Sequence, residues 1–502
     1  MNPGVDRFPR KRGLPGFHWH DPAHRIMLLV IALAVAARLF AIFASFPHLH
    51  WADESYKFFE PAHRMAFGYG LVVWEFRDGI SSPVLPAMFA TLWTLIAPVF
   101  DDPRAYVYTA QILLALLSIP GVIAVVRMGL CTSPTHALIA GVAAATWYEI
   151  VYYAGRPLSE AVATTALIVA LSLASMPQQR LTRSRLMGIG AGLGVVLMLR
   201  IQLAPALLVA ACLIGQLNFR ERWWPMALGG AIPVVLFAGA DWLYWGNPLA
   251  STLTNVQVQL LQNKASTFGV MPADWYLTSV ATMWGKSAWP VLLVLVALRA
   301  RASFLWIAVA LVILATHSLV PHKEYRFIFP ALACLIVTAA MGSADLVEKG
   351  RGWLPPRWGQ VLVVGVMAAW IAVSVARPRS SAIRPHWTQS TELLQATLEL
   401  PAIASLCGVL FKDFHVSNGG GYAYIRRKVP IYGFGITPPP ASTDPYNAVV
   451  LKRASIPQAS LPDFRLRACF GSRGDEDVCV LERAGACKHD PSLRSTLEDP
   501  QI

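Results

Sequence analysis

Several apolar runs in this chain approach the roughly 20 residues that an α-helix needs to cross a bilayer. Hydrophobic residues make up 55% of its 502 residues and charged residues only 14%, which is well below the charged share of ordinary soluble domains. These features predict an all-α polytopic membrane protein. The first run, 26–46, is longer than the core of a signal peptide and lacks a convincing cleavage site, so it is expected to remain as the first span.

Basic residues gather in short loops that alternate along the sequence, and in these loops they outnumber acidic residues. This is the positive-inside pattern, which predicts that the basic loops are cytoplasmic. It also accounts for the formal net charge of +13 without nucleic acid, so no nucleic-acid partner is expected. The basic loops hold Arg7, Arg10, Lys11, Arg12, Arg25, Arg127, Arg180, Arg183, Arg185, Arg220, Arg222, Arg299, Arg301, Lys349, Arg351 and Arg357.

Together, runs and loops predict a cytoplasmic tail (1–25) and a transmembrane domain (26–376) with eleven crossings, which leaves the C-terminal segment outside. The predicted spans are 26–46, 106–126, 136–153, 159–176, 186–199, 202–217, 225–244, 279–298, 302–319, 328–345 and 359–376. If one further apolar run, 83–100, also crossed the membrane, every later loop would lie on the opposite side and the basic loops would be outside. This run is therefore predicted to enter the outer leaflet and return, within a long first outer loop, 47–104.

Residues 377–502 lack long apolar runs and are predicted to form a small α/β domain on the outer face. A helical stretch at 388–399 alternates with β-like stretches at 408–411, 429–434, 448–451 and 478–481. Four of the seven cysteines lie in this segment: Cys407, Cys469, Cys479 and Cys487. Their even number fits two disulfides in an oxidising compartment, with the pairing left open. The chain has no Asn-x-Ser/Thr sequon, which favours a bacterial periplasm over an ER lumen.

Ionisable side chains crowd the predicted outer face. Two adjacent carboxylates, Asp53 and Glu54, are followed closely by Glu60 and His63. Locally, this stretch also fits a polar amphipathic helix that lies on lipid headgroups. Charged groups at membrane depth are costly, so each is expected to have a partner or a function. The other candidates on this face are Trp74, Glu75, Arg156, Glu160, Arg200, His322, Lys323, Glu324 and Arg326.

The cationic segment 322–326 lies on the side where basic residues are disfavoured, and it therefore predicts a bound anion such as a lipid phosphate. A basic cluster that touches lipid headgroups is the weaker alternative for this segment. For Arg156 and Glu160, an internal ion pair is an equal alternative. For Arg200, the alternative is snorkelling to the interface. The combined expectation is an outer cavity with carboxylates on one wall and cations on another. No metal-ligand cluster is evident, so neither a metal nor another cofactor is expected.

Two motifs on this face resemble glycosyltransferase family 22, which contains GPI mannosyltransferases and lumenal α-mannosyltransferases with the GT-C membrane fold. The first runs from Asp53-Glu54 through Glu60-Pro-Ala-His63 and Phe67-Gly-Tyr-Gly70 to Val73-Trp-Glu-Phe76. The second, His322-Lys-Glu-Tyr-Arg-Phe327, is similar to the family signature His-Lys-Glu-x-Arg-Phe. The likeness covers about 25–345. Family members more often carry Thr-Trp-Glu-Trp at 73–76.

The resemblance implies an inverting transfer of mannose from a polyprenyl- or dolichyl-phosphate donor to a glycan or glycolipid acceptor, forming an α-mannoside. Inversion needs a general base near the acceptor hydroxyl and a stabilised leaving group on the opposite face of the sugar. Asp53 is the expected base, and Glu54 is expected to orient the acceptor or share this role. Residues expected to bind substrate are Glu60, His63, Trp74, Glu75, Arg156, Glu160, Arg200, His322, Lys323, Glu324 and Arg326.

The expected location is a bacterial inner membrane with a periplasmic site, or an ER membrane with a lumenal site in a eukaryote. Two alternatives stay open. One is a GT-C transferase that uses another polyprenyl-phosphate sugar, such as aminoarabinose or a hexose. The other is a lipid or sugar transporter, although the sequence lacks the repeated halves typical of transporters.

Overall fold

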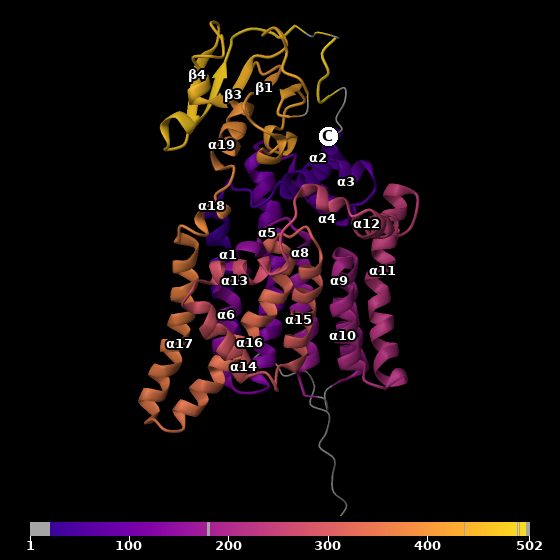
Figure 1. Ribbon diagram of the computed structural model, residues 1–502, viewed down its shortest axis with the longest axis vertical. Coiled ribbons are helices and arrows are strands. Elements are labelled where there is room, and N and C mark those ends of the chain that lie inside the picture. The colour runs from indigo at the N-terminus through magenta and orange to yellow at the C-terminus, as the bar shows by residue number, and fades with distance from the viewer. Residues whose placement is uncertain (1–20, 178–180, 436, 489, 491, 498–502) are drawn as a thin grey trace, which may run out of the picture.

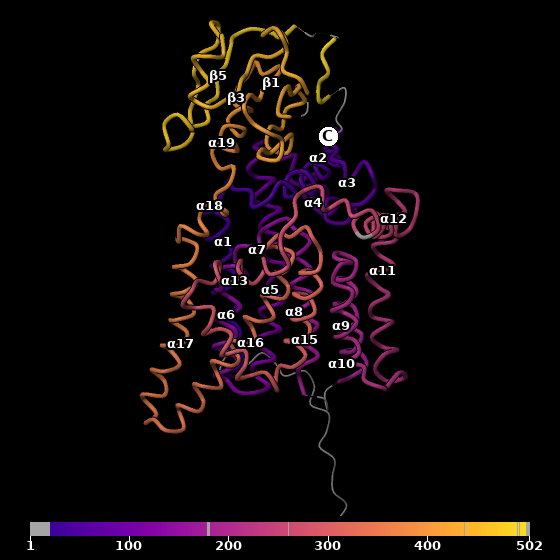
Figure 2. The backbone as a smooth tube through the Cα atoms, in the orientation of Figure 1, coloured from indigo at the N-terminus to yellow at the C-terminus, as the bar shows by residue number. Residues whose placement is uncertain are grey.

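The computed structural model describes residues 21–177, 181–435, 437–488, 490 and 492–497. Three layers follow one another along its longest axis (Figure 1 and Figure 2). A helical bundle forms the first layer. A group of short helices, mostly from the loop 47–104, covers one end of this bundle and is called the collar below. The C-terminal α/β domain lies on the collar.

The bundle helices begin and end as the sequence predicts within a few residues. They are α1 Pro22–Ser45, α5 Pro103–Leu130, α6 Pro134–Thr146, α7 Tyr148–Ala154, α8 Ser159–Ser175, α9 Arg183–Leu199, α10 Ala204–Gly215, α11 Trp224–Trp245, α13 Trp275–Trp284, α14 Ala288–Leu298, α15 Phe304–Leu319, α16 Phe329–Arg351 and α17 Pro356–Ala376. Caps explain several starts. The side chain of Asp102 accepts from the Arg104 amide before α5, and Pro103 occupies the first turn.

All eleven predicted spans are helical, but the count of eleven crossings is not confirmed. Among the described residues, five helices are long and apolar enough to cross a membrane, or up to seven if each of two bent pairs is one span. The bent pairs are α6 with α7, at 54°, and α13 with α14, at 105°. Four shorter apolar helices include α8 and α15. The fold is therefore mostly helical, with a small C-terminal sheet.

Helix α16 is the most enclosed element of the bundle. In its most apolar stretch, 94% of the residues are buried. The short 3₁₀-helix η7 Tyr325–Ile328 leads directly into it. Because α16 is packed on all sides, side chains on η7 have a rigid support at the collar end of the bundle.

The collar is built from η1 Glu54–Phe59, which is a π-helix, α2 Glu60–Phe67, α3 Trp74–Arg77 and α4 Val84–Ile96, with α12 Ala250–Asn255 beside them. With 13 residues, α4 is shorter than a membrane span. The indole Nε1 of its Trp93 donates to the carbonyl of Tyr106 at 2.8 Å. The apolar run 83–100 thus lies across the end of the bundle.

A cysteine introduced at position 102 is expected to react with a membrane-impermeant thiol reagent added to the collar side, because 53% of the Asp102 side chain is exposed. Glu221→Cys, which lies in the exposed turn before α11, is the matched probe for the opposite side. Exposed Cys131 and Cys212 would first be replaced by serine. Labelling of both positions from the same side would contradict the proposed topology.

The C-terminal domain contains α18 Arg384–Trp387, α19 Thr391–Glu399, α20 Tyr422–Ile425 and a five-stranded sheet. Its strands are β1 Val409–Phe411, β2 Ile431–Gly433, β3 Ala448–Lys452, β4 Arg465–Phe470 and β5 Val478–Glu482. The sheet order is β2-β1-β3-β5-β4, in which β1 pairs in parallel with β2 and β3 while β5 runs antiparallel to β3 and β4. Disulfides join Cys407 to Cys487 and Cys469 to Cys479.

Candidate active site

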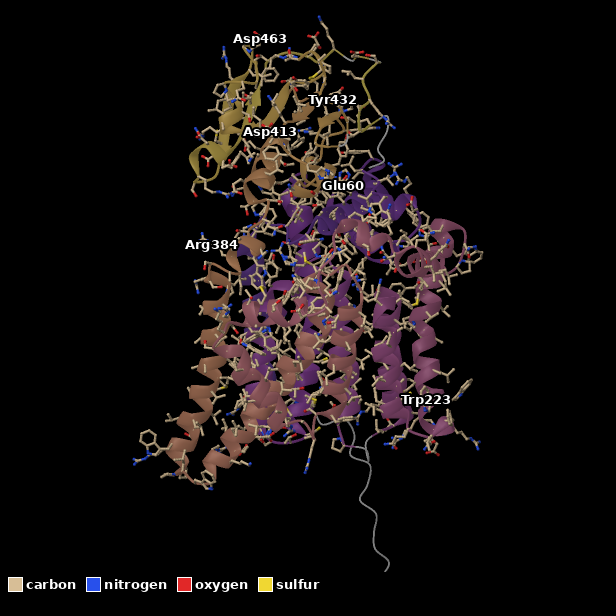
Figure 3. The ribbon with its side chains drawn as sticks, viewed as in Figure 1. Glu60, Trp223, Arg384, Asp413, Tyr432 and Asp463 are labelled. Atoms are coloured by element: carbon tan, nitrogen blue, oxygen red, sulfur yellow. A yellow bond between two sulfur atoms is a disulfide. The ribbon has the colours of Figure 1, made fainter. Side chains whose placement is uncertain are left out.

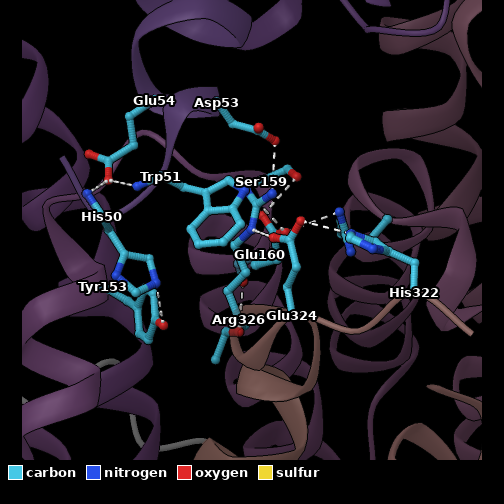
Figure 4. Close-up of polar contacts among 12 residues, drawn as sticks. His50, Trp51, Asp53, Glu54, Tyr153, Ser159, Glu160, His322, Glu324 and Arg326 are labelled. Atoms are coloured by element: carbon cyan, nitrogen blue, oxygen red, sulfur yellow. Dashed lines mark hydrogen bonds and ion pairs between the residues drawn. The ribbon is translucent and has the colours of Figure 1, made fainter. Parts of the chain in front are cut away.

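The two sequence motifs meet where the collar covers the ends of α8, α9 and α16, and Arg326 of η7 lies at the centre of this meeting point (Figure 4). Arg326 is buried, with 4% of its surface exposed. Its Nη2 lies 3.0 Å from Oδ2 of Asp53, and its Nε lies 2.5 Å from Oε2 of Glu324. Its Nη1 lies 3.7 Å from Oε1 of Glu160. One guanidinium thus links carboxylates from three segments of the chain.

Asp53 directly precedes the π-helix η1 and keeps 23% of its side chain exposed. Burial by itself would raise the pKa of this carboxyl, but the positive charges of Arg326 and Lys57 hold the pKa below its usual value. The group is therefore ionised at neutral pH. Arg326 contacts only Oδ2, so the second oxygen is not engaged by this guanidinium.

Glu160 brings a second arginine to the cluster. Its Oε1 lies 3.1 Å from Nη1 of Arg200, while the hydroxyl of Ser159 donates to Oε2 at 3.2 Å. Arg200 lies at the break between α9 and η3 Ile201–Leu203. The break turns its side chain toward the collar end of the bundle. Both arginines also lie near the ring of Phe327, at 5.0 and 5.3 Å from its centre.

His322 belongs to the same network through Glu324. Its Nε2 lies 3.0 Å from Oε1 of Glu324, and its Nδ1 lies 3.0 Å from the carbonyl oxygen of Gly269. Because both partners are acceptors, this arrangement favours the imidazolium. The hydrogen bond with Glu324 accordingly raises the pKa of His322.

Lys323 does not join the cluster around Arg326. Its ammonium donates to the carbonyl oxygens of Val320 and Met271, at 2.5 and 3.2 Å. The residue is buried. It ties the strand-like segment after α15 to the loop before α13.

Glu54 and Arg156 form a separate buried cluster, and Glu54 points away from Asp53 (Figure 4). Nη1 of Arg156 lies 3.4 Å from Oε2 of Glu54 and donates to the carbonyl of His48 at 2.7 Å. Oε1 of Glu54 accepts from the amide of His50 at 2.6 Å. Burial raises the pKa of Glu54, although Arg156 acts against this. The alternative ion pair between Arg156 and Glu160 is not formed.

Glu60 and His63 face the C-terminal side of the collar, away from Arg326. Both oxygens of Glu60 accept from backbone amides, those of Leu71 at 2.7 Å and Ala423 at 2.6 Å. Burial raises the pKa of Glu60 to about 8, and these amides oppose the shift. His63 contacts the carbonyl of Tyr69 at 2.8 Å, and burial lowers its pKa to about 4.

Trp74 and Glu75 lie on the collar. The Trp74 ring stacks on Phe268 with 5.8 Å between centres, and the ammonium of Lys264 lies 5.7 Å from the Trp74 ring. Burial raises the pKa of Glu75 to about 7, an effect that Lys57 opposes and the negative charge of Asp53 reinforces. Glu75 is thus within electrostatic reach of Asp53.

A small cavity of about 70 Å³ opens between the collar, α8, α9 and α12. Its polar lining includes Lys57, Ser81, Ser159, Arg200, Gln202 and Asn255. Gln202 donates to Asn255 at 3.0 Å, which joins the two amides across the lining. Lys57 is not among the residues predicted from the sequence, although its position four residues after Asp53 places both on one side of a helix. The cavity therefore has a cationic wall beside an ionised carboxylate.

Comparison with known proteins adds to this picture. Residues 29–385 match the model of the Alg9-like mannosyltransferase family. GPI mannosyltransferase 3 of Yarrowia lipolytica is 27% identical over 64% of this chain and 63% of its own length. GPI alpha-1,2-mannosyltransferase 3 of Danio rerio is 23% identical over 63% of this chain and 59% of its own length. The chain therefore spans less than two thirds of the length of these curated relatives.

A solved structure resembles almost the whole chain. ArnT from Cupriavidus metallidurans bound to undecaprenyl phosphate aligns with a TM-score of 0.58 and 12% identity, over 92% of this chain and 99% of that chain. At this identity the likeness shows a shared fold alone, and that fold is the GT-C fold.

Proposed function

We infer that this chain, which belongs to the Alg9-like mannosyltransferase family, is a membrane mannosyltransferase that uses a polyprenyl-phosphate mannose donor. The observation that carries the proposal is the contact of Asp53 with Arg326 beside the cavity that Lys57 and Arg200 line. This arrangement offers a carboxylate base and a phosphate-binding wall within one site. The undecaprenyl phosphate bound to ArnT supports a polyprenyl carrier.

In the proposed reaction, Asp53 accepts the proton of an acceptor hydroxyl as its oxygen attacks C1 of the mannose. The bond between C1 and the phosphate oxygen breaks, and the polyprenyl phosphate leaves with the electron pair. Attack opposite the leaving group inverts the configuration at C1 and forms an α-mannoside from a β-linked donor. The low pKa of Asp53 keeps the base ionised before the reaction starts.

The departing phosphate gains negative charge, and fixed cations are the groups that stabilise it. Lys57 and Arg200 line the cavity, and we assign them to the phosphate together with Arg326 and His322. Glu160 orients Arg200, while Glu324 orients Arg326 and His322. Fixed geometry of this kind lowers the cost of reorganisation during the transfer.

Other residues near this site receive supporting roles in the proposal. Glu54 and Arg156 stabilise the turn that precedes Asp53. The ring of Trp51, whose centre lies 5.6 Å from the Arg326 guanidinium, and the ring of Trp74 offer surfaces for sugar faces. We assign Glu75, whose pKa the charge of Asp53 helps to raise, to orienting an acceptor hydroxyl.

We further propose that the site faces the outside, which is the periplasm if the membrane is a bacterial inner membrane and the lumen if it is an ER membrane. The C-terminal domain with its two disulfides lies at the collar end of the bundle. The turn that holds Arg220, Arg222 and Trp223 lies at the opposite end (Figure 3). This distribution of charge and disulfides supports that orientation.

The function can be tested with purified protein and radiolabelled polyprenyl-phosphate sugars. Label is expected to move from the mannose donor to membrane glycolipids and not from the glucose or aminoarabinose donors. Mass spectrometry of glycolipids from a deletion strain would identify the acceptor as the species that loses one hexose. Transfer from another sugar donor but not from mannose would overturn the proposed donor.

Affinity for undecaprenyl phosphate is expected to depend on pH through His322. Glu324 raises the pKa of this imidazole, so its positive charge persists above the ordinary value near 6.5 and is lost as pH rises through the raised pKa. Binding should weaken over that interval. His322→Gln is expected to bind undecaprenyl phosphate with a flatter pH profile. Because the ligand phosphate titrates in the same way with both proteins, the difference between the two profiles reports His322 alone. Identical profiles would exclude His322 from phosphate binding.

A further inference from the structure

Glu60 was predicted from the sequence to bind substrate. In the structure it lies where the collar meets the C-terminal domain and joins the two (Figure 3). It is completely buried. One oxygen accepts from the amide of Leu71 in the collar, and the other accepts from the amide of Ala423 in α20. These two bonds attach the start of α2 to a segment 363 residues later in the chain.

The fit around this carboxylate leaves no space for a side chain at position 421. Gly421 has a φ of +62°, and a Cβ at this position would lie 2.6 Å from Oε1 of Glu60. Two independent requirements, the left-handed backbone and the close approach, therefore select glycine here.

Apolar contacts extend the same junction. Tyr56 and Leu71 of the collar belong to one buried cluster with Val409 and Val480 of the sheet. Tyr69 of the collar also meets the ring of Tyr422, with 5.4 Å between centres. The collar and the C-terminal domain therefore share a hydrophobic core.

Arg426 adds a polar contact at the rim of the junction. Its guanidinium lies 3.9 Å from the centre of the Phe67 ring and donates to the hydroxyl of Tyr106 at 2.9 Å. It also lies 3.6 Å from Oδ1 of Asp101. Elements of the collar and α5 are thus held by one side chain from the C-terminal domain.

We propose that Glu60 is a positioning residue through which the C-terminal domain holds Asp53 against Arg326. Asp53 and Glu60 lie seven residues apart on the continuous helical path of η1 and α2. Such a path transmits a displacement at Glu60 to Asp53. The family match covers Glu60 but ends at residue 385, so the partner of Glu60 at Ala423 lies beyond it. The inference rests on the proposed function of Asp53.

Two variants test the coupling. Glu60→Gln keeps the size of the side chain but faces one backbone N–H with an NH₂ group, so one of the two bonds is lost. Gly421→Ala pushes a methyl group against Oε1. Gly474→Ala is the matched control, because Gly474 also has a left-handed φ of +65° and its Cβ would meet no atom within 4 Å.

With polyprenyl-phosphate mannose as the probe, Glu60→Gln and Gly421→Ala are expected to lower kcat at least tenfold and to leave the donor KM within twofold. Gly474→Ala should change neither. When Asp53→Asn is already present, Glu60→Gln should cause no further loss of the residual single-turnover rate, because the two residues act as a unit. In Glu60→Gln and Gly421→Ala, backbone amides in 53–60 are expected to exchange faster than in wild type, while exchange in α16 stays unchanged. This expectation holds whether or not mannose is the donor sugar.

Unchanged kcat in both variants would overturn the coupling while leaving the proposed function intact. A loss of thermal stability with proportionate loss of kcat and donor binding would also overturn it, because the junction would then be structural only. If wild-type protein transfers no mannose, the proposed function fails, and the exchange measurement alone decides the coupling: faster exchange in 53–60 supports it, and unchanged exchange overturns it.

Discussion

Asp53→Asn is expected to lower kcat by roughly 10²- to 10⁴-fold, the usual contribution of a general base. The amide is nearly the same size as the carboxylate and retains an oxygen that can accept from Arg326, but it cannot take a proton at neutral pH. Donor binding should therefore change little. Single-turnover transfer and equilibrium binding of undecaprenyl phosphate, measured on the same preparation, separate the two effects.

Glu54→Gln is the matched control for this substitution, because it removes a neighbouring carboxylate that contacts Arg156 and backbone amides. It is expected to lower thermal stability more than the rate of transfer in the folded fraction. Wild-type kcat in Asp53→Asn would exclude Asp53 as the base. Glu75, whose pKa of about 7 suits proton transfer, would then be the next carboxylate to test.

Arg326→Ala is expected to have the second large effect, because it removes the cation common to Asp53, Glu160 and Glu324. A charge-assisted hydrogen bond contributes about 1.5–3 kcal/mol, so affinity for undecaprenyl phosphate should fall roughly 10- to 150-fold. Removing one member of a buried ion pair also costs about 3–5 kcal/mol of stability. Binding titrations and thermal unfolding would record the two losses.

Arg326→Lys separates charge from geometry, since an ammonium keeps the charge but cannot bridge three carboxylates as a planar guanidinium does. Its affinity is expected to lie between those of wild type and the alanine variant. Arg200→Ala should weaken donor binding without disturbing the contact between Asp53 and Arg326. Undiminished affinity in Arg326→Ala would contradict a phosphate contact and leave Arg326 with a structural role.

The sequence predicted that the two motifs face the same side of the membrane, and Asp53 and Arg326 lie 3.0 Å apart. The sequence alone could not show which residues next to Asp53 and Arg326 join the same cluster, because that depends on the backbone conformation. Glu324 has extended φ and ψ angles, so side chains alternate in direction there. His322 therefore meets Glu324, while Lys323 between them bonds to backbone carbonyls instead. Arg326 reaches Glu324 from the 3₁₀-helix η7.

The collar shows the same limit in a helical segment. Regular helical spacing would place Glu60 on the face of Asp53, because seven residues make nearly two α-helical turns. The π-helix η1 lies between them and holds more residues per turn. It turns Glu60 toward Ala423. The local residue pattern does not indicate that the number of residues per turn changes here.

In the bundle, every apolar run that was predicted to span the membrane is helical, but the runs did not determine the number of crossings. Whether a helix crosses depends on bends, such as the 105° between α13 and α14, that hydropathy does not record. In the C-terminal domain, β4 was not among the predicted strands. This strand lies at the edge of the sheet, and its first three residues are exposed. It therefore lacks the apolar pattern that marks the buried strands.

The shared core of the collar and the sheet has a consequence for synthesis of the protein. Tyr56 and Leu71 emerge from the ribosome early, whereas Val480, which completes their cluster, emerges near the end. Until then, the apolar face of the collar has no finished partner, and the helix that starts after Asp53 lacks its anchor at Ala423. The collar around Asp53 is thus unsupported until the last strand of the sheet has been synthesised.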